Sequence, residues 1–184
     1  MAPILPKRAK PRLGSGREVA STLVLGVGNT LLTDDGAGVH AAMQLAQQAA
    51  DQPEVRVLDA GTLGFALLAE VQRCNALIVF DATSSSGIPG TVTVRESTDM
   101  DAFVRRRGRS VHEVGLADLL DMARLTDSLP RRRALIGIEA KTIDWGMACT
   151  SPVHAALPRA VTEALEVLER WRDRSPSEDI ANVV

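Results

Sequence analysis

The sequence contains few of the residues that mark several large classes of protein. Its 184 residues include two cysteines, Cys74 and Cys149, which lie far apart and have no C-x-x-C spacing. This argues against a disulfide framework or a cysteine zinc site, so we expect two reduced thiols. No apolar run approaches the ~18 residues of a membrane span. The basic N-terminus lacks the apolar segment of a signal peptide, and we therefore expect a cytoplasmic protein.

Aromatic residues and net charge are also scarce. Aromatic side chains make up 3% of the chain, so Leu, Val, Ile and Ala must fill the core, and the formal net charge is only -2. A balance so near neutrality favours neither a nucleic-acid binder nor a membrane-surface protein. The length fits one domain. We expect a basic, disordered arm at 1–21, a single α/β domain at 22–174 and a flexible tail at 175–184.

Apolar runs typical of buried strands alternate with amphipathic stretches typical of helices. Strands are expected at 21–27, 54–61, 76–83, 91–97 and 133–140, and helices at 36–50, 64–74, 113–126 and from Ser151 and Pro152 onward. This alternation predicts a three-layer α/β/α sandwich around a twisted, mostly parallel five-stranded sheet. Right-handed crossovers place the second, first and third strands side by side. Ligands of such sheets bind at this switch point, outside the carboxyl ends of the strands.

A Gly-Val-Gly turn follows the first predicted strand. Gly26 and Gly28 match the first two glycines of the dinucleotide fingerprint G-x-G-x-x-G, but Leu31 occupies the third position. Two adjacent aspartates, Asp34 and Asp35, would also repel a phosphate at the start of the next helix. Nucleotide binding is therefore disfavoured. Two alternatives remain: one of the aspartates caps the helix, or the loop presents a carboxylate for chemistry at the end of the strand.

The third predicted strand also ends in an aspartate. Asp81 follows the apolar run L-I-V-F directly, and the serines at 84–86 could simply bond to it. The predicted strand order nevertheless puts Asp81 beside the loop that carries Asp35, where the two carboxylates could form an acid–base pair or half of a metal site. His112 precedes a predicted helix and could face the same cleft. Two carboxylates and one imidazole suit zinc, nickel or manganese and leave positions for water or substrate.

Four segments give the sequence a family resemblance. They are, in chain order, LVLGVGNTLLTDDGAGV (23–39), LDAGTLGFALL (58–68), LIVFDATSSSGIPGTV (77–92) and HEVGLADLL (112–120). The first segment follows the pattern G-x-G-N-x-L-x-x-D-D/E-G-x-G, which is specific on its own. Its combination with Asp81 at a later strand end and with the pattern H-x-x-G-L from His112 is more specific than the first segment alone. On these segments the sequence resembles the [NiFe]-hydrogenase maturation endopeptidases. The similarity leaves out only the N-terminal arm and the tail.

The resemblance implies a fold and a reaction. The fold is an α/β/α sandwich around a twisted sheet, which agrees with the pattern above. The reaction is removal of a C-terminal peptide from the precursor of a [NiFe]-hydrogenase large subunit after nickel insertion, with the nickel in the precursor as the recognition signal. The expected partner is therefore that precursor, and the expected metal is nickel that the precursor supplies. Neither nucleic acid nor a membrane is expected as a partner.

The resemblance also implies a site. Three residues that approach the metal in the family map onto Asp35, Asp81 and His112. Many members have Glu at the first of these positions, so the side chain of Asp35 is one methylene shorter than theirs. Residues 61–64, with Gly61, Thr62 and Gly64, match the family's Gly-Thr-rich turn and are expected to line the substrate cleft.

The sequence is compatible with metal-assisted hydrolysis. It has no G-x-S-x-G elbow, and neither cysteine is near a histidine in sequence. A metal ion can polarise the scissile carbonyl and lower the pKa of a bound water, while Asp35 or Asp81 serves as the general base. These expectations describe an aspartic-type, nickel-dependent peptidase. A non-catalytic nickel-binding module that uses the same three residues is the alternative.

Overall fold

A five-stranded sheet forms the centre of the computed structural model, which describes residues 22–62, 64, 66–85, 87–106 and 115–173. The strands are β1 (Thr22–Val27), β2 (Val55–Gly61), β3 (Ala76–Thr83), β4 (Val92–Glu96) and β5 (Arg132–Glu139). Their order is β2-β1-β3-β5-β4, with β4 antiparallel to β5 and all other pairs parallel. The predicted fold class and the predicted neighbours of β1 are therefore confirmed. The predicted arm at 1–21 and the tail at 175–184 lie outside the described residues.

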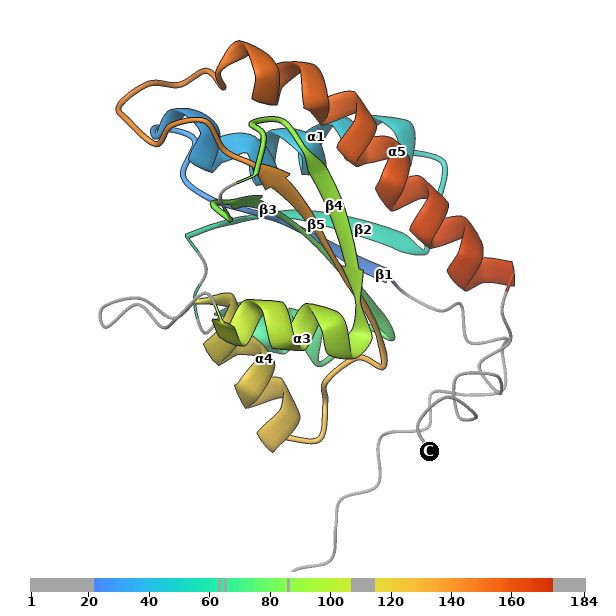
Figure 1. The fold of residues 1–184 in the computed structure, drawn as a ribbon. Coiled ribbons are helices and arrows are strands. Elements are labelled where there is room, and N and C mark those ends of the chain that lie inside the picture. The colour runs from blue at the N-terminus through green and yellow to red at the C-terminus, as the bar shows by residue number, and fades with distance from the viewer. Residues whose placement is uncertain (1–21, 63, 65, 86, 107–114, 174–184) are drawn as a thin grey trace, which may run out of the picture.

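Helices cover both faces of the sheet (Figure 1). One layer contains α1 (Ala37–Gln48) and α5 (Ser151–Asp173), and the other contains α2 (Ala66–Val71), α3 (Ser97–Arg106) and α4 (Leu116–Leu125). Successive strand residues point to opposite faces, so Val24 and Ile78 pack in the core under α1 and α5, while Leu23 and Leu77 pack under the other layer. Within the described residues, no helix is long and apolar enough to cross a membrane.

The helix α3 was not expected from the sequence. Its segment is rich in charge, and only Met100 and Val104 are fully buried, with Phe103 partly buried beside them. Phe103 and Val104 follow Met100 by three and four residues, which is the spacing of a helical stripe, but the stripe is short and its neighbours are polar. The guanidinium of Arg95 lies 3.9 Å from the centre of the Phe103 ring and adds a cation–π contact.

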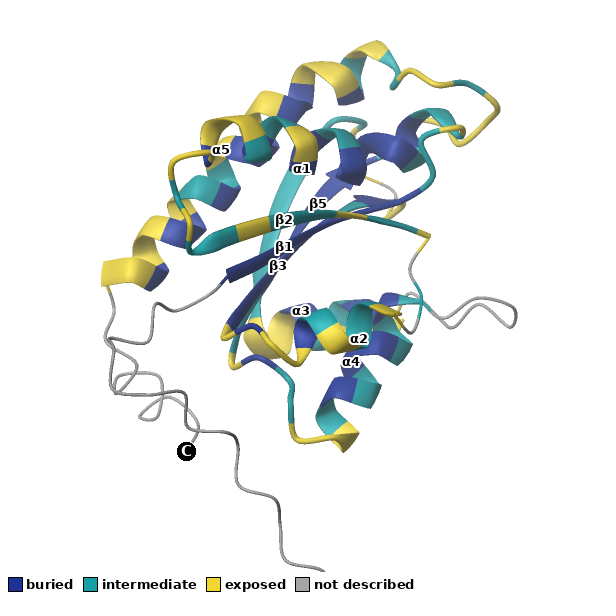
Figure 2. Cartoon of the chain, turned by 180° about the vertical axis from the view of Figure 1, so that it is seen from behind, coloured by how far each residue is buried: buried dark blue, intermediate teal, exposed yellow. Residues whose placement is uncertain are grey.

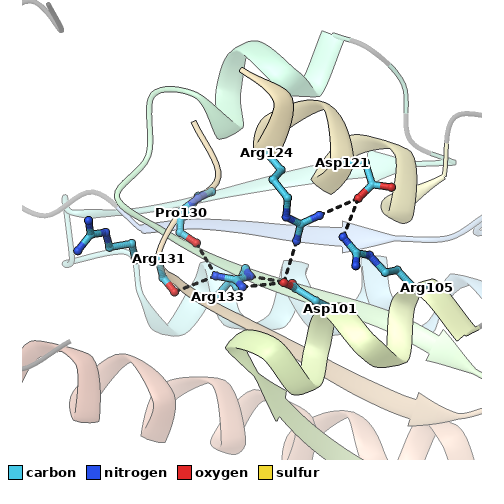
Figure 3. A network of polar contacts seen from close by, with 7 residues as sticks. All are labelled: Asp101, Arg105, Asp121, Arg124, Pro130, Arg131 and Arg133. Carbon is cyan, nitrogen blue, oxygen red and sulfur yellow. Dashed lines mark hydrogen bonds and ion pairs between the residues drawn. The ribbon is translucent and has the colours of Figure 1, made fainter. Parts of the chain in front are cut away.

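A network of charged side chains joins α3 and α4 to β5 (Figure 3). Asp101 receives two hydrogen bonds from Arg133, at 2.8 Å from Nε to Oδ1 and 2.7 Å from Nη2 to Oδ2, in the bidentate geometry typical of strong pairs. Arg124 of α4 donates to both Asp101 and Asp121, and Arg105 of α3 also pairs with Asp121. The network therefore fixes the two helices that flank residues 107–114, the segment that contains His112.

Candidate functional site

The turn after β1 lies in direct contact with the segment that carries Asp34 and Asp35. Gly28 has a φ of 127°, which a side chain rarely tolerates, and a Cβ built there would lie 1.8 Å from the carbonyl oxygen of Asp35. At the start of α1, a Cβ on Gly38 would meet the carbonyl oxygens of Val27 and Phe80 at 2.3 and 2.5 Å. These glycines therefore let the segment with the two aspartates lie against the carboxyl ends of β1 and β3.

Asp35 lies at this edge of the sheet, in a short 3₁₀ helix, η1 (Thr33–Gly36). Its Oδ2 accepts a hydrogen bond of 2.7 Å from the backbone N–H of Asn29. This contact fixes the carboxylate over the turn that follows β1, with the side chain only partly buried. A carboxylate that is oriented by one N–H and still reached by solvent can accept a proton or bind a cation.

Asp34 has a different function from the predicted helix cap. The residue before α1 is Gly36, and no side chain caps that helix. The fully buried carboxylate of Asp34 instead accepts hydrogen bonds from the backbone N–H groups of Lys141, Thr142 and Thr150, at 2.9, 3.1 and 2.6 Å, and one of 2.8 Å from the Thr150 hydroxyl. The cap prediction was therefore wrong: Asp34 holds the segment between β5 and α5.

The start of α5 depends on the same contacts. The carbonyl of Thr150 accepts the first helical hydrogen bond, from the N–H of His154 at 2.8 Å, while the N–H and hydroxyl of Thr150 are bound to Asp34. The helix begins at Ser151, one residue before the predicted first helical position, Pro152. One carboxylate thus positions both the loop and the helix that follows it.

Asp81 is in β3, partly buried, opposite Gly137 of β5. The strand contacts η1, so Asp81 and Asp35 belong to elements that meet at the carboxyl end of the sheet, as predicted. The structure describes no group of three or more His, Cys, Asp or Glu side chains suited to a metal ion among its residues. His112 lies outside the described residues, so the set of Asp35, Asp81 and His112 stays a prediction.

Glu139, at the end of β5, is a buried carboxylate at this edge of the sheet that the sequence analysis did not single out. Its buried carboxylate accepts hydrogen bonds from the Thr83 hydroxyl at 2.9 Å, from the N–H and hydroxyl of Ser85 at 2.7 Å each, and from the N–H of Gly87 at 3.0 Å. It therefore holds the chain that leaves β3 just after Asp81. The signal was present, because Glu139 follows an apolar run directly, as Asp81 does.

Both buried carboxylates at this edge are stabilised as anions. Burial raises the pKa of Asp34, but the hydrogen bonds from the N–H groups of Thr150, Lys141 and Thr142 and from the Thr150 hydroxyl lower it by more. The pKa of Asp34 is therefore below its ordinary value. The same holds for Glu139, where burial raises the pKa and the hydrogen bonds from Ser85, Gly87 and Thr83 lower it by more. The edge thus carries negative charge that neutral donors stabilise without cancelling.

The predicted cleft residues lie beside the Gly28 turn. The carbonyl of Gly61 accepts a 2.8 Å hydrogen bond from the N–H of Gly28, and Gly61 has a φ of 50°. Among the described residues other than the chain neighbours of each glycine, no atom lies within 4 Å of a Cβ built on Gly61 or on Gly64, and Thr62 is exposed. This open space is compatible with a substrate beside the turn, and a role for these residues in binding stays a prediction.

The two cysteines are free, as expected. Cys74 is buried under the α2–α4 layer, and burial raises the pKa of its thiol to about 11. Cys149 precedes α5, and burial together with the charge of Asp34 raises the pKa of its thiol. Thiols with raised pKa values are poor nucleophiles, which agrees with a site built from carboxylates.

The sequence and the fold are similar to those of proteins of one kind. A family model described as hydrogenase maturation protease matches residues 39–167. The hydrogenase expression/formation protein HupD of Rhizobium leguminosarum bv. viciae is 38% identical over 152 residues, which cover 81% of this chain and 74% of that protein. The hydrogenase 2 maturation protease of Escherichia coli K12 is 34% identical over 147 residues, covering 79% of this chain and 89% of that protein.

Solved structures agree with these relatives. The hydrogenase maturating endopeptidase HybD from E. coli has a TM-score of 0.74 and 32% identity, covering 82% of this chain and 93% of that one. The [NiFe] hydrogenase maturation protease HybD from Thermococcus kodakarensis has a TM-score of 0.67 and 32% identity, covering 80% and 98%. The sheet order, the two carboxylate-bearing elements at its carboxyl edge and these matches lead to one conclusion: the chain belongs to the hydrogenase maturation protease family.

Proposed function

We propose that this protein is an endopeptidase that removes a C-terminal peptide from the nickel-loaded precursor of a [NiFe]-hydrogenase large subunit. The proposal rests on the family and on one feature of the structure. Asp35 and Asp81 come from two elements that contact each other at the carboxyl edge of the sheet, η1 and β3. That is the edge where open α/β sheets bind their ligands.

The nickel is part of the substrate in this proposal. Carboxylate oxygens and an imidazole nitrogen are suitable ligands for it, so we propose that Asp35, Asp81 and His112 approach it when the precursor binds. A bound metal polarises the scissile carbonyl and lowers the pKa of a nearby water. The dependence on nickel then works as a check on assembly, since a precursor without nickel lacks part of what the protease binds.

The carboxylates of the protein account for the proton transfers. Water adds to the scissile carbonyl carbon as Asp35 or Asp81 takes one of its protons, and that proton passes to the leaving nitrogen when the C–N bond breaks. Asp35 is suited to this because a single N–H, from Asn29, orients its carboxylate. Asp34 is not, because three backbone N–H groups and a hydroxyl already occupy its oxygens.

A processing assay tests the proposal. The purified protein is incubated with nickel-loaded and nickel-free precursor, and the mass of the large subunit is measured. We expect a shortened C-terminus only with the nickel-loaded form, and no product with Asp35→Asn or Asp81→Asn. Asp51→Asn, which changes an exposed turn residue after α1, is the matched control and should cleave normally. Tight binding of the nickel-loaded precursor without any cleavage would support a non-catalytic nickel-binding module instead.

The residue type at position 35 gives a sharper test. Many members of the family have Glu where this chain has Asp35, so Asp35→Glu extends the carboxylate by one methylene and keeps its charge. We expect Asp35→Glu to retain cleavage and Asp35→Asn to abolish it. Equal loss in both variants would mean that the position requires the exact length of aspartate and would argue against a shared geometry with those members.

A further inference from the structure

Four large exposed apolar side chains belong to two hydrogen-bonded segments at the carboxyl edge of the sheet. They are Leu31, Ile143, Trp145 and Met147, which are 50%, 53%, 81% and 74% exposed. We call this group the apolar rim. Leu31 belongs to the turn before η1, and the other three belong to the segment between β5 and α5, which Figure 2 draws as largely exposed.

Backbone hydrogen bonds join the two segments of the apolar rim. The N–H of Gly146 donates to the carbonyl of Leu31 at 3.0 Å, and the N–H of Thr33 donates to the carbonyl of Gly146 at 2.7 Å. The Thr33 hydroxyl adds contacts of 3.0 Å to the carbonyl of Thr142 and 3.1 Å from the N–H of Asp144. Both views of the ribbon show the two segments side by side (Figures 1 and 2).

The order of this loop does not come from its apolar side chains. Trp145 and Met147 bury little surface among the described residues, whereas the ends of the loop are held by Asp34 through Lys141, Thr142 and Thr150. Burying a carboxylate is costly unless it is fully hydrogen-bonded. Thr33 also has a φ of 36°, which is strained for a β-branched residue. The chain thus holds an exposed apolar loop in place through the hydrogen bonds of Asp34 and Thr33 rather than through burial of the loop's own apolar side chains.

The other exposed apolar side chains do not form such a group. Among the described residues, the remaining ones are Met43 in α1, Ile88 before β4 and Leu125 at the end of α4, each on a separate element. Single exposed apolar residues are ordinary on protein surfaces, while gathered ones mark interaction sites. Exposed Trp and Met are also enriched in protein–protein interfaces.

We propose that the apolar rim is the surface on which the hydrogenase large-subunit precursor docks, through an apolar patch of the precursor next to its cleavage site. This inference rests on the proposed function. It follows from continuity: Leu31 and Asn29 are in one turn, and Asn29 orients Asp35, so any protein cleaved at Asp35 must cover the surface around it. A folded substrate brings its own surface to that edge, and the rim supplies an apolar counterpart for it.

Steady-state cleavage of the nickel-loaded precursor tests the proposal. Trp145→Ser should raise KM about tenfold, which corresponds to the loss of about 1.4 kcal/mol of binding, and Trp145→Ser with Met147→Ser should raise it further. We expect kcat and the melting temperature to change little, because neither side chain is buried. Leu125→Ser is the matched control, since that residue is 86% exposed at the end of α4, away from the rim. Unchanged KM in the double variant would overturn the proposal.

A binding measurement separates this inference from the proposed function. The inactive variant Asp35→Asn is mixed with precursor while tryptophan emission is recorded. Trp171 is already buried, so a blue shift that is lost when Asp35→Asn is combined with Trp145→Ser reports burial of Trp145 rather than of a tryptophan of the precursor. If wild-type protein cleaves and no shift appears, docking on the rim is wrong. If a shift appears and wild-type protein never cleaves, the proposed endopeptidase activity is wrong and the rim is a docking surface for a different purpose.

The protein alone provides the last control. If the rim joined two copies of this chain, sedimentation would show a dimer that Trp145→Ser dissociates, and that result would contradict docking of the precursor. We expect sedimentation of the protein alone to be unchanged by Trp145→Ser.

Discussion

Buried and partly buried carboxylates are used in two different ways in this molecule. At the carboxyl edge of the sheet, Asp34 and Glu139 accept hydrogen bonds from backbone N–H groups and hydroxyls. In the layer of α3 and α4, Asp101 is bound by the guanidinium groups of Arg133 and Arg124 (Figure 3). Neutral donors fix the backbone of loops and leave the negative charge in place, whereas guanidinium groups join elements and cancel the charge.

The difference matches what each region has to do. Where a cation or a proton must be received, as we propose for Asp35 and Asp81, neighbouring charges that remain negative favour its arrival. Where two helices and a strand only have to stay together, a neutralised cluster is stable and inert. The two regions can therefore be separated by experiments on stability, pH and salt.

The largest expected effect on stability is that of Asp34→Asn, compared with the same substitution at the adjacent Asp35. Asp34→Asn replaces one acceptor oxygen by an NH₂ group that faces N–H donors, so we expect the free energy of unfolding to fall by about 3 kcal/mol. Asp35→Asn changes a partly buried side chain that accepts one hydrogen bond from the described residues, the N–H of Asn29, and should cost less than about 1 kcal/mol. Chemical denaturation measures both. Equal losses would mean that Asp34 has no special role in holding the loop.

The ionic cluster predicts a smaller loss. Asp101→Asn keeps the shape of the side chain but removes the charge that faces Arg133 and Arg124, and we expect a loss of about 2 kcal/mol in the free energy of unfolding. Asp99→Asn changes an exposed residue of the same helix and serves as the control. A loss in the control as large as that of Asp101→Asn would assign the effect to α3 itself rather than to the ion pairs.

Acid should destabilise both regions in the same direction. Burial raises the pKa values of Asp34, Glu139 and Asp101, but hydrogen bonds and, for Asp101, the nearby arginines bring each below its ordinary value of about 4. The folded state therefore binds fewer protons than the unfolded chain, so the stability is complete above about pH 5 and is lost as the pH falls through the folded pKa values. Melting temperatures are measured between about pH 3 and pH 6. We expect them to depend less on pH in Asp34→Asn and in Asp101→Asn than in the wild-type protein.

Salt gives the smallest effect and the clearest contrast. The pairs of Asp121 with Arg105 and Arg124 are partly exposed, so raising the ionic strength should weaken them by a few tenths of a kcal/mol, on the order of surface ion pairs. The contacts of Asp34 involve no opposite charge and should not respond. The free energies of unfolding of the wild-type protein and of Asp121→Asn are compared in low and in high salt. If the variant depends on salt as strongly as the wild type, the salt dependence does not come from the ion pairs of Asp121.

The strands, and the order of β2, β1 and β3, were predictable because they depend on the local apolar pattern and on the handedness of crossovers. The position of Asp81 in β3 was predictable for the same reason, since a carboxylate directly after an apolar run stands out, while its role in the site stays a prediction. Asp34 was not, because its partners lie 107 to 116 residues further along the chain. The sequence around Asp34 indicates only interactions with neighbouring residues, and the helix cap that it predicted was such an interaction.

Two other features show where local patterns are insufficient. The helix α3 depends on Met100, Phe103 and Val104 meeting a surface that other elements build, so its own sequence is too polar to indicate it. Exposure of Trp145 could not be inferred either, because an isolated Trp in a sequence is expected to be at least partly buried. Both depend on the assembled tertiary structure.

The contacts of Asp34 also have a consequence for the order of events during synthesis. The residues that Asp34 binds emerge from the ribosome long after β1 and α1, and contacts of such large sequence separation form late in folding. β1, α1 and β3 can associate while the loop and α5 are still absent. The carboxyl edge, where we propose that the precursor is cut, therefore forms completely only after Thr150 has been made, and we expect a chain that ends before Thr150 to lack the contacts that hold this edge.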